Sequence, residues 1–271
     1  MVRARFAAAC LAVACWLGSG GLQAQEAESF PRVYAWETPP QGWLELTLWE
    51  TVITHSKLPY RHFGLTTDRA RLWAQSLEAE YGLTDQFSVA VYGDFEKPDD
   101  HALAFSRGRV EARYRLFGRR QRLVDPALYV EYYFPRAKYD APEQLEARLI
   151  LERDIGDFRV GVNPVFGKAL SGEEVKERTY LGVAAGTYYR RLWRLQPGLE
   201  LFWNTGQLGS TPPVSRHWVI LSPSIDLNLH QSLSWHVAAG IGLTDGSDRF
   251  LVRSYLTYQF ETVRPSSQQQ E

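Results

Sequence analysis

The sequence predicts an all-β fold, a transmembrane antiparallel up-and-down β-barrel of about twelve strands. Three observations support this prediction. Apolar and polar residues alternate with a period of two over many segments, which indicates strands with one apolar and one polar face. The connections between these segments differ in length in a regular way. Aromatic residues make up 13% of a chain whose mean hydropathy is −0.31, a combination typical of transmembrane strands with a polar inner half.

The segment 72–95 shows the alternation most clearly and reads as a hairpin. Its first arm sets apolar against small or polar residues, namely Trp73, Leu77, Ala79, Tyr81 and Leu83 against Ala74, Ser76, Glu78 and Glu80. Its second arm does the same, with Phe87, Val89, Val91, Gly93 and Phe95 against Ser88, Ala90, Tyr92 and Asp94. The joint at 83–86 is short and polar, so the two arms are expected to be antiparallel neighbours.

The other strands of the first half follow the same pattern. Residues 42–54 alternate leucines with glutamate and threonine, and residues 105–117 alternate an arginine-rich face with small and apolar side chains. Residues 126–134 alternate Leu, Val and Phe with Tyr and Glu, while residues 143–154 alternate leucines with Glu and Arg. With the two arms of the hairpin, these segments give six expected strands.

The second half repeats the scheme. A tight turn at 155–157 leads into a strand that begins at Phe158 and has Val160 and Val162 on its apolar face. Five more strands are expected at residues 178–190, 197–205, 216–229, 231–243 and 249–260.

Connection lengths favour a membrane barrel over a water-soluble sandwich. The brief connections lie near residues 84, 156, 193 and 230, the longer ones near 60, 100, 138, 172 and 210, and one of intermediate length near 120. Outer-membrane barrels have short periplasmic turns and longer extracellular loops, whereas a sandwich has no reason to keep one set short. The strands also approach the length of about 9–11 residues needed for a tilted membrane crossing.

The ends of the chain differ from the barrel segment. Residues 1–24 have basic residues, an apolar run and a small residue at the end, and are expected to be a cleaved secretory signal peptide. Residues 25–41 show no periodicity and are expected to form a periplasmic lead-in to a barrel at 42–260. Residues 261–271 are expected to be a polar tail.

Composition excludes several classes of function. Both cysteines, Cys10 and Cys15, lie in the expected signal peptide, so neither a disulfide framework nor a thiolate metal site is predicted. Of the 30 Lys and Arg residues, Arg3 and Arg5 would also be removed, which leaves 28 against 31 Asp and Glu. A chain with this acidic balance and no basic patch is not expected to bind nucleic acid.

Ionisable residues on the non-lipid faces are the candidate functional residues, because a charge on the lipid face costs a few kcal/mol at the bilayer midplane. The residues expected to line the lumen and set selectivity are Glu80, Arg107, Arg109, Glu111, Arg113, Glu131, Glu146, Arg148 and Arg253. They allow two interpretations. The arginines and carboxylates could line a water-filled pathway, as charged rows do in pores, or they could pair with one another and plug a narrow barrel.

An enzyme is a further class. Outer-membrane phospholipase A is also a twelve-stranded barrel and uses a serine and a histidine oriented by an asparagine, with calcium. Here Ser215 and His217 could form a nucleophile–base pair, but residues two apart on a strand are not in close contact, and no matching asparagine is visible. His55 and His62 lack the spacing of metal ligands. We therefore expect no enzyme activity, no metal and no cofactor.

Two motifs resemble known barrels. The ending at 255–260 resembles the terminal signal strand of bacterial outer-membrane proteins, although this chain continues to Glu271. The turn at 81–87 is similar to one common in the MetA-pathway, transporter-like barrel family. These resemblances imply a bacterial outer-membrane location, contact with the lipid bilayer and lipopolysaccharide, and recognition of the 250–260 strand by the barrel-assembly machinery.

The prediction is therefore a monomeric outer-membrane channel or transporter that passes small hydrophilic or aromatic solutes through a narrow charged lumen. The alternatives are an outer-membrane lipid-modifying hydrolase and a plugged structural barrel.

Overall fold

The computed structural model describes residues 30–262, except for 64, 138–140, 172–178 and 209–210. The expected signal peptide at 1–24 and residues 263–271 of the expected tail lie outside the described residues.

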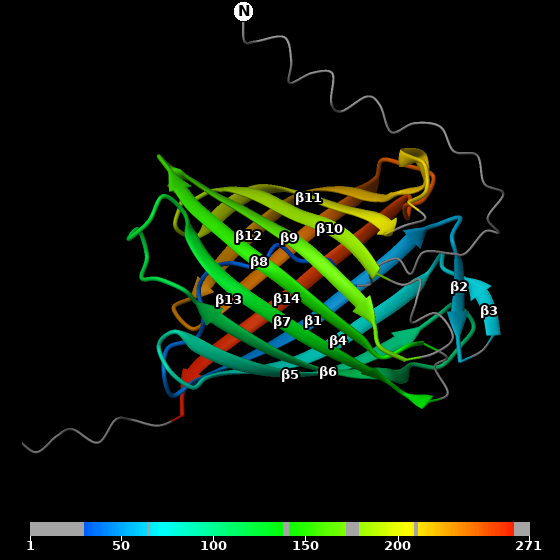
Figure 1. The fold of residues 1–271 in the computed structure, drawn as a ribbon, viewed down its shortest axis with the longest axis horizontal. Helices are drawn as coiled ribbons and strands as arrows, with labels where there is room; N and C mark the ends of the chain where they lie inside the picture. The colour runs from blue at the N-terminus through cyan, green and yellow to red at the C-terminus, as the bar shows by residue number, and fades with distance from the viewer. Residues whose placement is uncertain (1–29, 64, 138–140, 172–178, 209–210, 263–271) are drawn as a thin grey trace, which may run out of the picture.

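Twelve antiparallel strands form one closed barrel (Figure 1). In chain order they are β1 (Trp43–His55), β4 (Leu72–Gly82), β5 (Phe87–Lys97), β6 (Ala104–Arg115), β7 (Asp125–Pro135), β8 (Gln144–Ile155), β9 (Phe158–Ala169), β10 (Thr179–Tyr189), β11 (Leu195–Gln207), β12 (Trp218–His230), β13 (Leu233–Gly242) and β14 (Phe250–Glu261). Each strand pairs with its neighbour, and β1 pairs with β14 to close the ring. The predicted fold class and strand number are confirmed.

The hairpin of β4 and β5 illustrates how local sequence sets the fold. Its strands pair in continuous register from Trp73 opposite Lys97 to Gly82 opposite Ser88. In the turn, the hydroxyl of Thr84 accepts hydrogen bonds from the backbone N–H groups of Gln86 and Phe87 at 3.2 and 3.0 Å. A threonine at this position satisfies donors that a short turn would otherwise leave without partners.

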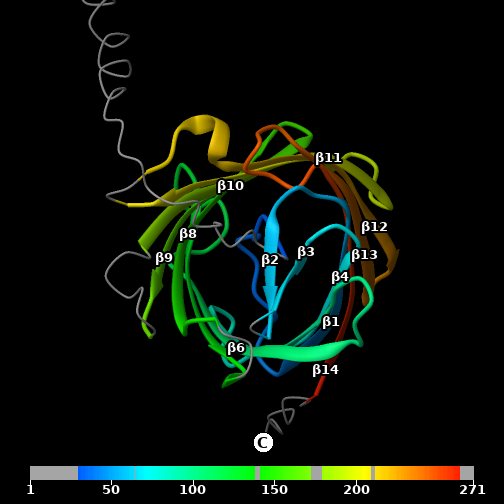
Figure 2. The same ribbon diagram turned by 90° about the vertical axis from the view of Figure 1, so that its right-hand side faces the viewer.

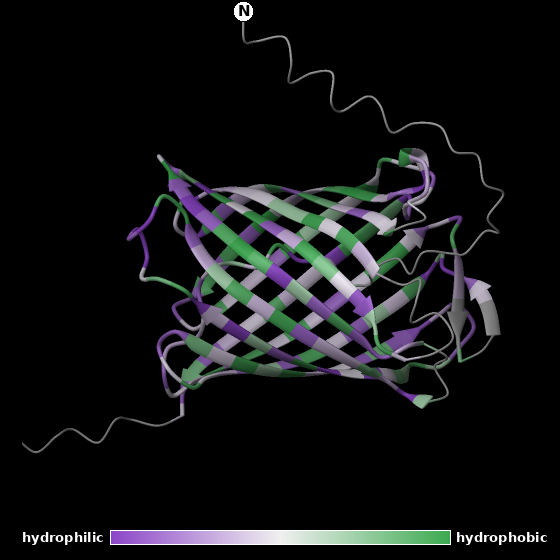
Figure 3. Ribbon diagram, viewed as in Figure 1, coloured by the Kyte–Doolittle hydropathy of each residue, from purple (hydrophilic) through white to green (hydrophobic). Residues whose placement is uncertain are grey.

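Alternation along each strand separates an apolar outer surface from a polar interior, and Figure 3 shows hydrophobic and hydrophilic residues alternating along the strands. Leu77 and Val91 point outward and are each 57% exposed, whereas Glu80 and Glu131 point inward and are each 1% exposed. A water-soluble protein has the reverse arrangement. Apolar side chains on the outside are stable only against hydrocarbon, so the outer surface fits a lipid bilayer.

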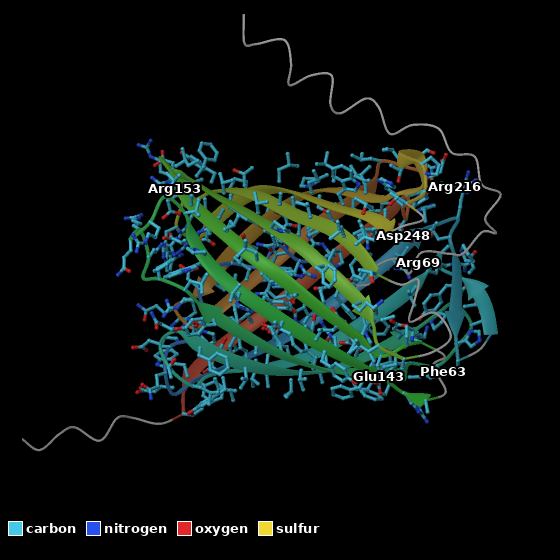
Figure 4. All side chains as sticks on the ribbon, in the orientation of Figure 1. Phe63, Arg69, Glu143, Arg153, Arg216 and Asp248 are labelled. Atoms are coloured by element: carbon cyan, nitrogen blue, oxygen red, sulfur yellow. The ribbon has the colours of Figure 1, made fainter. Side chains whose placement is uncertain are left out.

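The two ends of the barrel differ, as the connection lengths predicted. At one end, called here the short-turn end, brief connections join β4 to β5, β8 to β9 and β12 to β13. The opposite, long-loop end carries the connections from β1 to β4 and from β11 to β12. In Figure 4, Arg153 marks the short-turn end, and Phe63, Glu143 and Arg216 mark the long-loop end.

Two segments of the long-loop end differ from the expectation. The connection from β1 to β4, expected to be a polar loop, contains a small hairpin of β2 (Pro59–His62) and β3 (Leu65–Asp68) that lies across the opening (Figure 2). Residues Val214–Arg216 form a 3₁₀ turn, η2, so β12 begins at Trp218 rather than at 216. Among the described residues, no helix is long and apolar enough to cross a membrane.

The largest difference concerns the segment before β1. Residues 25–41 were expected to form a lead-in ahead of the barrel. Of these, residues 30–38, called here the inner segment, lie inside the barrel, and Figure 2 shows this dark-blue part of the chain within the ring of strands. Phe30, Tyr34 and Trp36 are all buried there. The sequence did not predict this position, because the partners of the inner segment are wall side chains far away in the sequence, and periodicity does not reveal such contacts.

Replacing an outward residue by arginine tests the position of the bilayer. Leu77 lies in the middle of β4, so Leu77→Arg should lower the free energy of unfolding by about 2–4 kcal/mol. The matched control is Leu83→Arg in the short turn, where the cost should be about 0–1 kcal/mol. Urea titrations of both variants in phospholipid vesicles would measure the difference. Equal losses would mean that Leu77 does not face hydrocarbon.

Candidate functional site: the barrel interior

The inner segment enters from the short-turn end. The backbone N–H of Gly42 donates to the carbonyl of Gly82 at 2.9 Å, and the N–H of Gln41 donates to the Asp85 carboxylate at 3.2 Å. Gly82 permits this crossing, because a Cβ on that residue would lie 2.1 Å from the carbonyl oxygen of Pro40. The chain therefore turns back into the barrel close to the turn between β4 and β5.

Side chains of the wall satisfy the backbone of the inner segment. Asn163 on β9 forms two hydrogen bonds with Tyr34, accepting from its N–H at 2.6 Å and donating to its carbonyl at 3.1 Å. The N–H of Trp36 donates to Glu152 at 3.2 Å. Arginines of the wall donate to three carbonyls of the segment, in the pairs Arg148–Arg32, Arg113–Glu37 and Arg253–Pro31. A buried segment without regular structure needs such partners, because its polar backbone groups would otherwise be unsatisfied.

The end of the inner segment is held by charge. Glu37 forms ion pairs with Arg159, at 2.9 Å, and with Arg119 in the turn between β6 and β7. Burial by itself would raise the pKa of Glu37 above the ordinary value of 4.5, but Arg159 and Arg119 outweigh it and hold the pKa below that value. Arg119 also contacts Glu152 at 3.0 Å, so the segment, a turn and strand β8 share one cluster of charges.

An arginine–carboxylate network fills the middle of the barrel. Arg109 donates to Glu131 at 2.6 Å, to Asp94 at 3.1 Å and to the hydroxyl of Ser76 at 3.2 Å. Its guanidinium also lies 4.0 Å from the centroid of the Tyr92 ring. The hydrogen-bond partners of Arg109 are buried groups of the wall, so this residue connects the adjacent strands β4, β5, β6 and β7.

The structure places all nine predicted lumen residues in the interior and pairs most of them with one another or with the inner segment. The pairs are Arg113 with Glu111 at 2.8 Å and with Glu80 at 3.5 Å, Arg148 with Glu146 at 2.5 Å, Arg109 with Glu131, Arg107 with Asp94 at 2.7 Å, and Arg253 with Glu200. Tyrosines complete the network: Tyr129 and Tyr133 both donate to Glu131, at 2.8 and 2.6 Å. Carboxylates in this interior are thus held by several donors each.

Apolar side chains fill the interior toward the long-loop end. This layer consists of Ile53, Leu72, Phe202, Trp218, Ile220 and Leu251 from five strands. Tyr60 of β2 packs onto it, and its hydroxyl donates to Glu96. The neighbouring Arg69 forms a buried ion pair with Asp248 at 2.9 Å, and Figure 4 shows both residues at this end. The loop between β1 and β4 therefore lies across the second end of the barrel and is anchored there by Tyr60 and Arg69.

One small cavity lies between the inner segment and the wall. Its volume is about 150 Å³, and its lining includes Arg32, Tyr34, Tyr188, Asp226 and Tyr255. It extends from the middle of the barrel toward the short-turn end, and its wall residues come from strands between β8 and β14. The cavity combines carboxylate, guanidinium and phenol groups, so it is suited to a small polar molecule.

Sequence reasoning missed the interior residues that are not in strands. Arg32 and Glu37 belong to a segment without periodicity, so nothing local indicated that they enter the lumen. Asp94 was placed on the polar face of the hairpin but not among the candidate lumen residues, although it binds two of the predicted arginines. Its position opposite Arg107 in adjacent strands was the available signal.

The serine–histidine pair considered from sequence does not have the geometry of a nucleophile and base. Nδ1 of His217 accepts a hydrogen bond from Nε1 of Trp203 at 3.0 Å, and Nε2 donates to the carbonyl of Pro212 at 3.0 Å. Both ring nitrogens are therefore engaged, and the imidazole has none to offer Ser215. Among the described residues, no group of three or more His, Cys, Asp or Glu side chains is arranged to hold a metal ion.

Neither a family model nor a curated protein matches the sequence. Solved structures do match. An outer membrane channel from Pseudomonas putida F1 has a TM-score of 0.55 at 13% identity, covering 83% of this chain and 98% of that chain. The NanC porin has a TM-score of 0.53 at 9% identity, covering 81% of this chain and all of that chain. At these identities the likeness shows the fold: this chain has the architecture of outer-membrane β-barrels, with a channel and a porin among its structural neighbours.

Removing the central arginine should strongly destabilise the barrel. Arg109→Met leaves Glu131 buried without its cation and Asp94 with Arg107 alone, so the free energy of unfolding should fall by about 3–5 kcal/mol. The control is Arg122→Met in an exposed turn, which should change it by no more than about 0.5 kcal/mol. Both can be measured by urea unfolding in vesicles. A loss below about 1 kcal/mol for Arg109→Met would mean that water solvates these carboxylates.

Proposed function

We propose that this protein is an outer-membrane channel that is closed by its own inner segment and opens when that segment withdraws, passing small hydrophilic or aromatic solutes. The observation that carries the proposal is the way the inner segment is held. Its backbone is bonded to wall side chains such as Asn163, Glu152 and Arg148, and it adds no strand to the sheet. Water could replace each of these bonds, so the segment could leave without breaking the barrel.

The way the inner segment is connected to the barrel favours a movable gate over a permanent plug. The inner segment is joined directly to β1 through residues 39–42, so withdrawal needs rotation only near Gly42, which has a φ of 79°. The structural neighbours include a channel and a porin of similar barrel architecture, which is consistent with a path through the barrel. In this proposal the short-turn end faces the periplasm, as is usual in outer-membrane barrels.

The chemistry of the wall suggests the class of solute. Once the inner segment is gone, the lumen would present arginines and carboxylates together with the hydroxyls of Tyr92, Tyr129 and Tyr133. A lumen lined by both positive and negative side chains does not exclude all anions or all cations. Its aromatic rings can also stack on a flat solute. Small polar or aromatic molecules fit such a lining better than large apolar ones.

A plugged structural barrel is the second candidate, because the network around Arg109 joins buried charges with several hydrogen bonds each. A network of this kind is expected to rigidify the interior. The two candidates differ in one measurable property, which is whether ions flow when the inner segment is free to move.

A disulfide can lock the inner segment to the wall. An ideal Cβ on Gly161 would lie 3.4 Å from Cγ1 of Val33, which is close to where a cysteine sulfur at position 33 would sit, so Val33→Cys/Gly161→Cys has suitable geometry. Cleavage of the expected signal peptide would remove both native cysteines, so the new pair would be the sole thiols. In planar bilayers the oxidised variant should be silent, and reduction should restore the discrete conductance steps of the parent protein.

The single variants Val33→Cys and Gly161→Cys are the controls and should not respond to reductant. Equal conductance of the double variant in both redox states would contradict gating by the inner segment. If the reduced variant and a chain lacking residues 30–38 were both folded but silent, the plugged structural barrel would replace the channel. An assay for lipid hydrolysis would then test the remaining alternative.

Closure should weaken in acid through Glu37. Its pKa is below 4.5, so the ionised carboxylate contributes to closure fully above pH 4.5, and this contribution is lost as the pH falls through the lowered pKa. Single-channel recordings should show a rising open probability below pH 4.5. Glu37→Gln should raise the open probability several-fold already at pH 7 and should respond less to acid. Charged groups that act on Glu37 are Arg115, Arg119, Arg159, Arg190 and Glu152, and Asp154 shares Arg119 with it.

If Glu37→Gln kept the closed state and the full acid response of the parent protein, the ion pairs of Glu37 would not hold the segment. Glu143→Gln serves as the matched control, because that exposed carboxylate lies at the long-loop end.

A further inference from the structure

The guanidinium of Arg32, on the inner segment, is enclosed by aromatic rings. Its Cζ lies 4.7 Å from the ring centroid of Trp49 and 5.2 Å from that of Tyr255, and 4.8 Å from the ring of Tyr34 on its own segment. Distances within about 6 Å are those at which the negative face of an aromatic ring attracts a cation. Aromatic rings grouped around one cation are an arrangement that proteins use to recognise organic cations.

A buried carboxylate completes the surroundings of Arg32. Oε2 of Glu78 lies 3.7 Å from Nη1 of Arg32, and the side chain of Glu78 is fully buried. This distance is too long for a hydrogen bond, and Nη1 has no hydrogen-bond partner among the described residues. The guanidinium is thus held by charge and by ring faces, with little directional bonding. Such a site selects a cationic group by its charge and size.

The wall part of this site does not depend on Arg32. Trp49 and Tyr255 are partners across the β1–β14 pairing, with ring centroids 4.7 Å apart. Trp49 donates from Nε1 to Glu78 at 2.7 Å, and Tyr92 donates to the same carboxylate at 2.8 Å. Tyr255 stacks on His236 with ring centroids 4.2 Å apart and planes at 6°. These wall residues, Trp49, Tyr255 and Glu78, are called the cage; they are fixed by the sheet, so the site is preorganised.

Space for a larger ligand adjoins the cage. The cavity of about 150 Å³ is lined by both Arg32 and Tyr255, together with Tyr188 and Asp226. The remainder of a small solute could lie there while its cationic end entered the cage. Asp226 adds a second carboxylate, and it also contacts Nδ1 of His236 at 2.6 Å.

We propose that the cage is a binding site for solutes with a guanidinium or alkylammonium group, and that Arg32 occupies it as a built-in substitute for such a solute. A solute that enters the cage displaces Arg32 and thereby loosens the inner segment; this second step rests on the proposed channel function. Anions are disfavoured, because the ring faces and Glu78 all present negative charge. Binding is therefore linked to opening through one shared site.

Equilibrium binding tests the site without relying on conductance. Arg32→Ala vacates the cage, and isothermal titration calorimetry of the folded variant in detergent would measure methylguanidinium binding. Arg32→Ala should bind methylguanidinium at least about tenfold more tightly than the parent protein does, because in the parent Arg32 competes for the cage. Methylurea, which has a similar shape but no charge, should not bind. The affinity of Arg32→Ala/Trp49→Leu for methylguanidinium should be at least about tenfold lower than that of Arg32→Ala.

Folding of each variant is checked by heat-modifiable migration in gels, and Arg32→Gln replaces Arg32→Ala if the latter does not fold. Equal binding of methylurea and methylguanidinium, or no binding to a folded Arg32 variant, overturns the proposal. Unchanged affinity in the Trp49→Leu background also overturns it, because the cage would not be the site.

Conductance separates this proposal from the channel proposal. Methylguanidinium should raise the open probability of the parent protein several-fold, and methylurea should not. Binding to Arg32→Ala in a barrel that never conducts would support the site and refute the channel. Redox-controlled conductance of the Val33→Cys/Gly161→Cys variant, without binding of methylguanidinium to Arg32→Ala, would support the channel and refute the cage.

Discussion

Polar groups at bilayer depth must find partners within the protein, because hydrocarbon offers none. The pairing of β1 with β14 meets this requirement for the backbone by leaving no edge strand in the barrel. The interior meets it for side chains, since Arg109 and its carboxylate partners are buried and bonded to one another. The outward leucines, the inward charges and the closed ring are therefore consequences of one constraint.

The inner segment supplies charged partners for wall residues at two depths of the barrel. Arg32 brings a cation to Glu78 in the middle of the barrel, and Glu37 brings an anion to Arg159 and Arg119 at the short-turn end. Withdrawal of the segment would leave these wall groups to water or to a solute. In the proposed mechanism, closing and solute recognition therefore use the same wall residues, so a ligand can shift the balance between the two states.

The outer membrane channel and the NanC porin are only 13% and 9% identical in sequence to this chain. Such low identities are expected where the fold depends on a period of two and on turn lengths, because many residue types satisfy an outward apolar or an inward polar position. The specific contents of the lumen are not fixed by the same rule.

The sequence by itself determined the barrel, because strand alternation and turn chemistry are local: the hairpin at 72–95 and the arginine-rich strand could be read without knowing their neighbours. It also placed Arg109 and Glu131 on inward faces. Only the tertiary structure placed the inner segment, since Tyr34 meets Asn163 across 129 positions of sequence and no periodicity marks the segment that carries Tyr34. It alone brought Trp49 to Tyr255, because those strands meet only when the barrel closes.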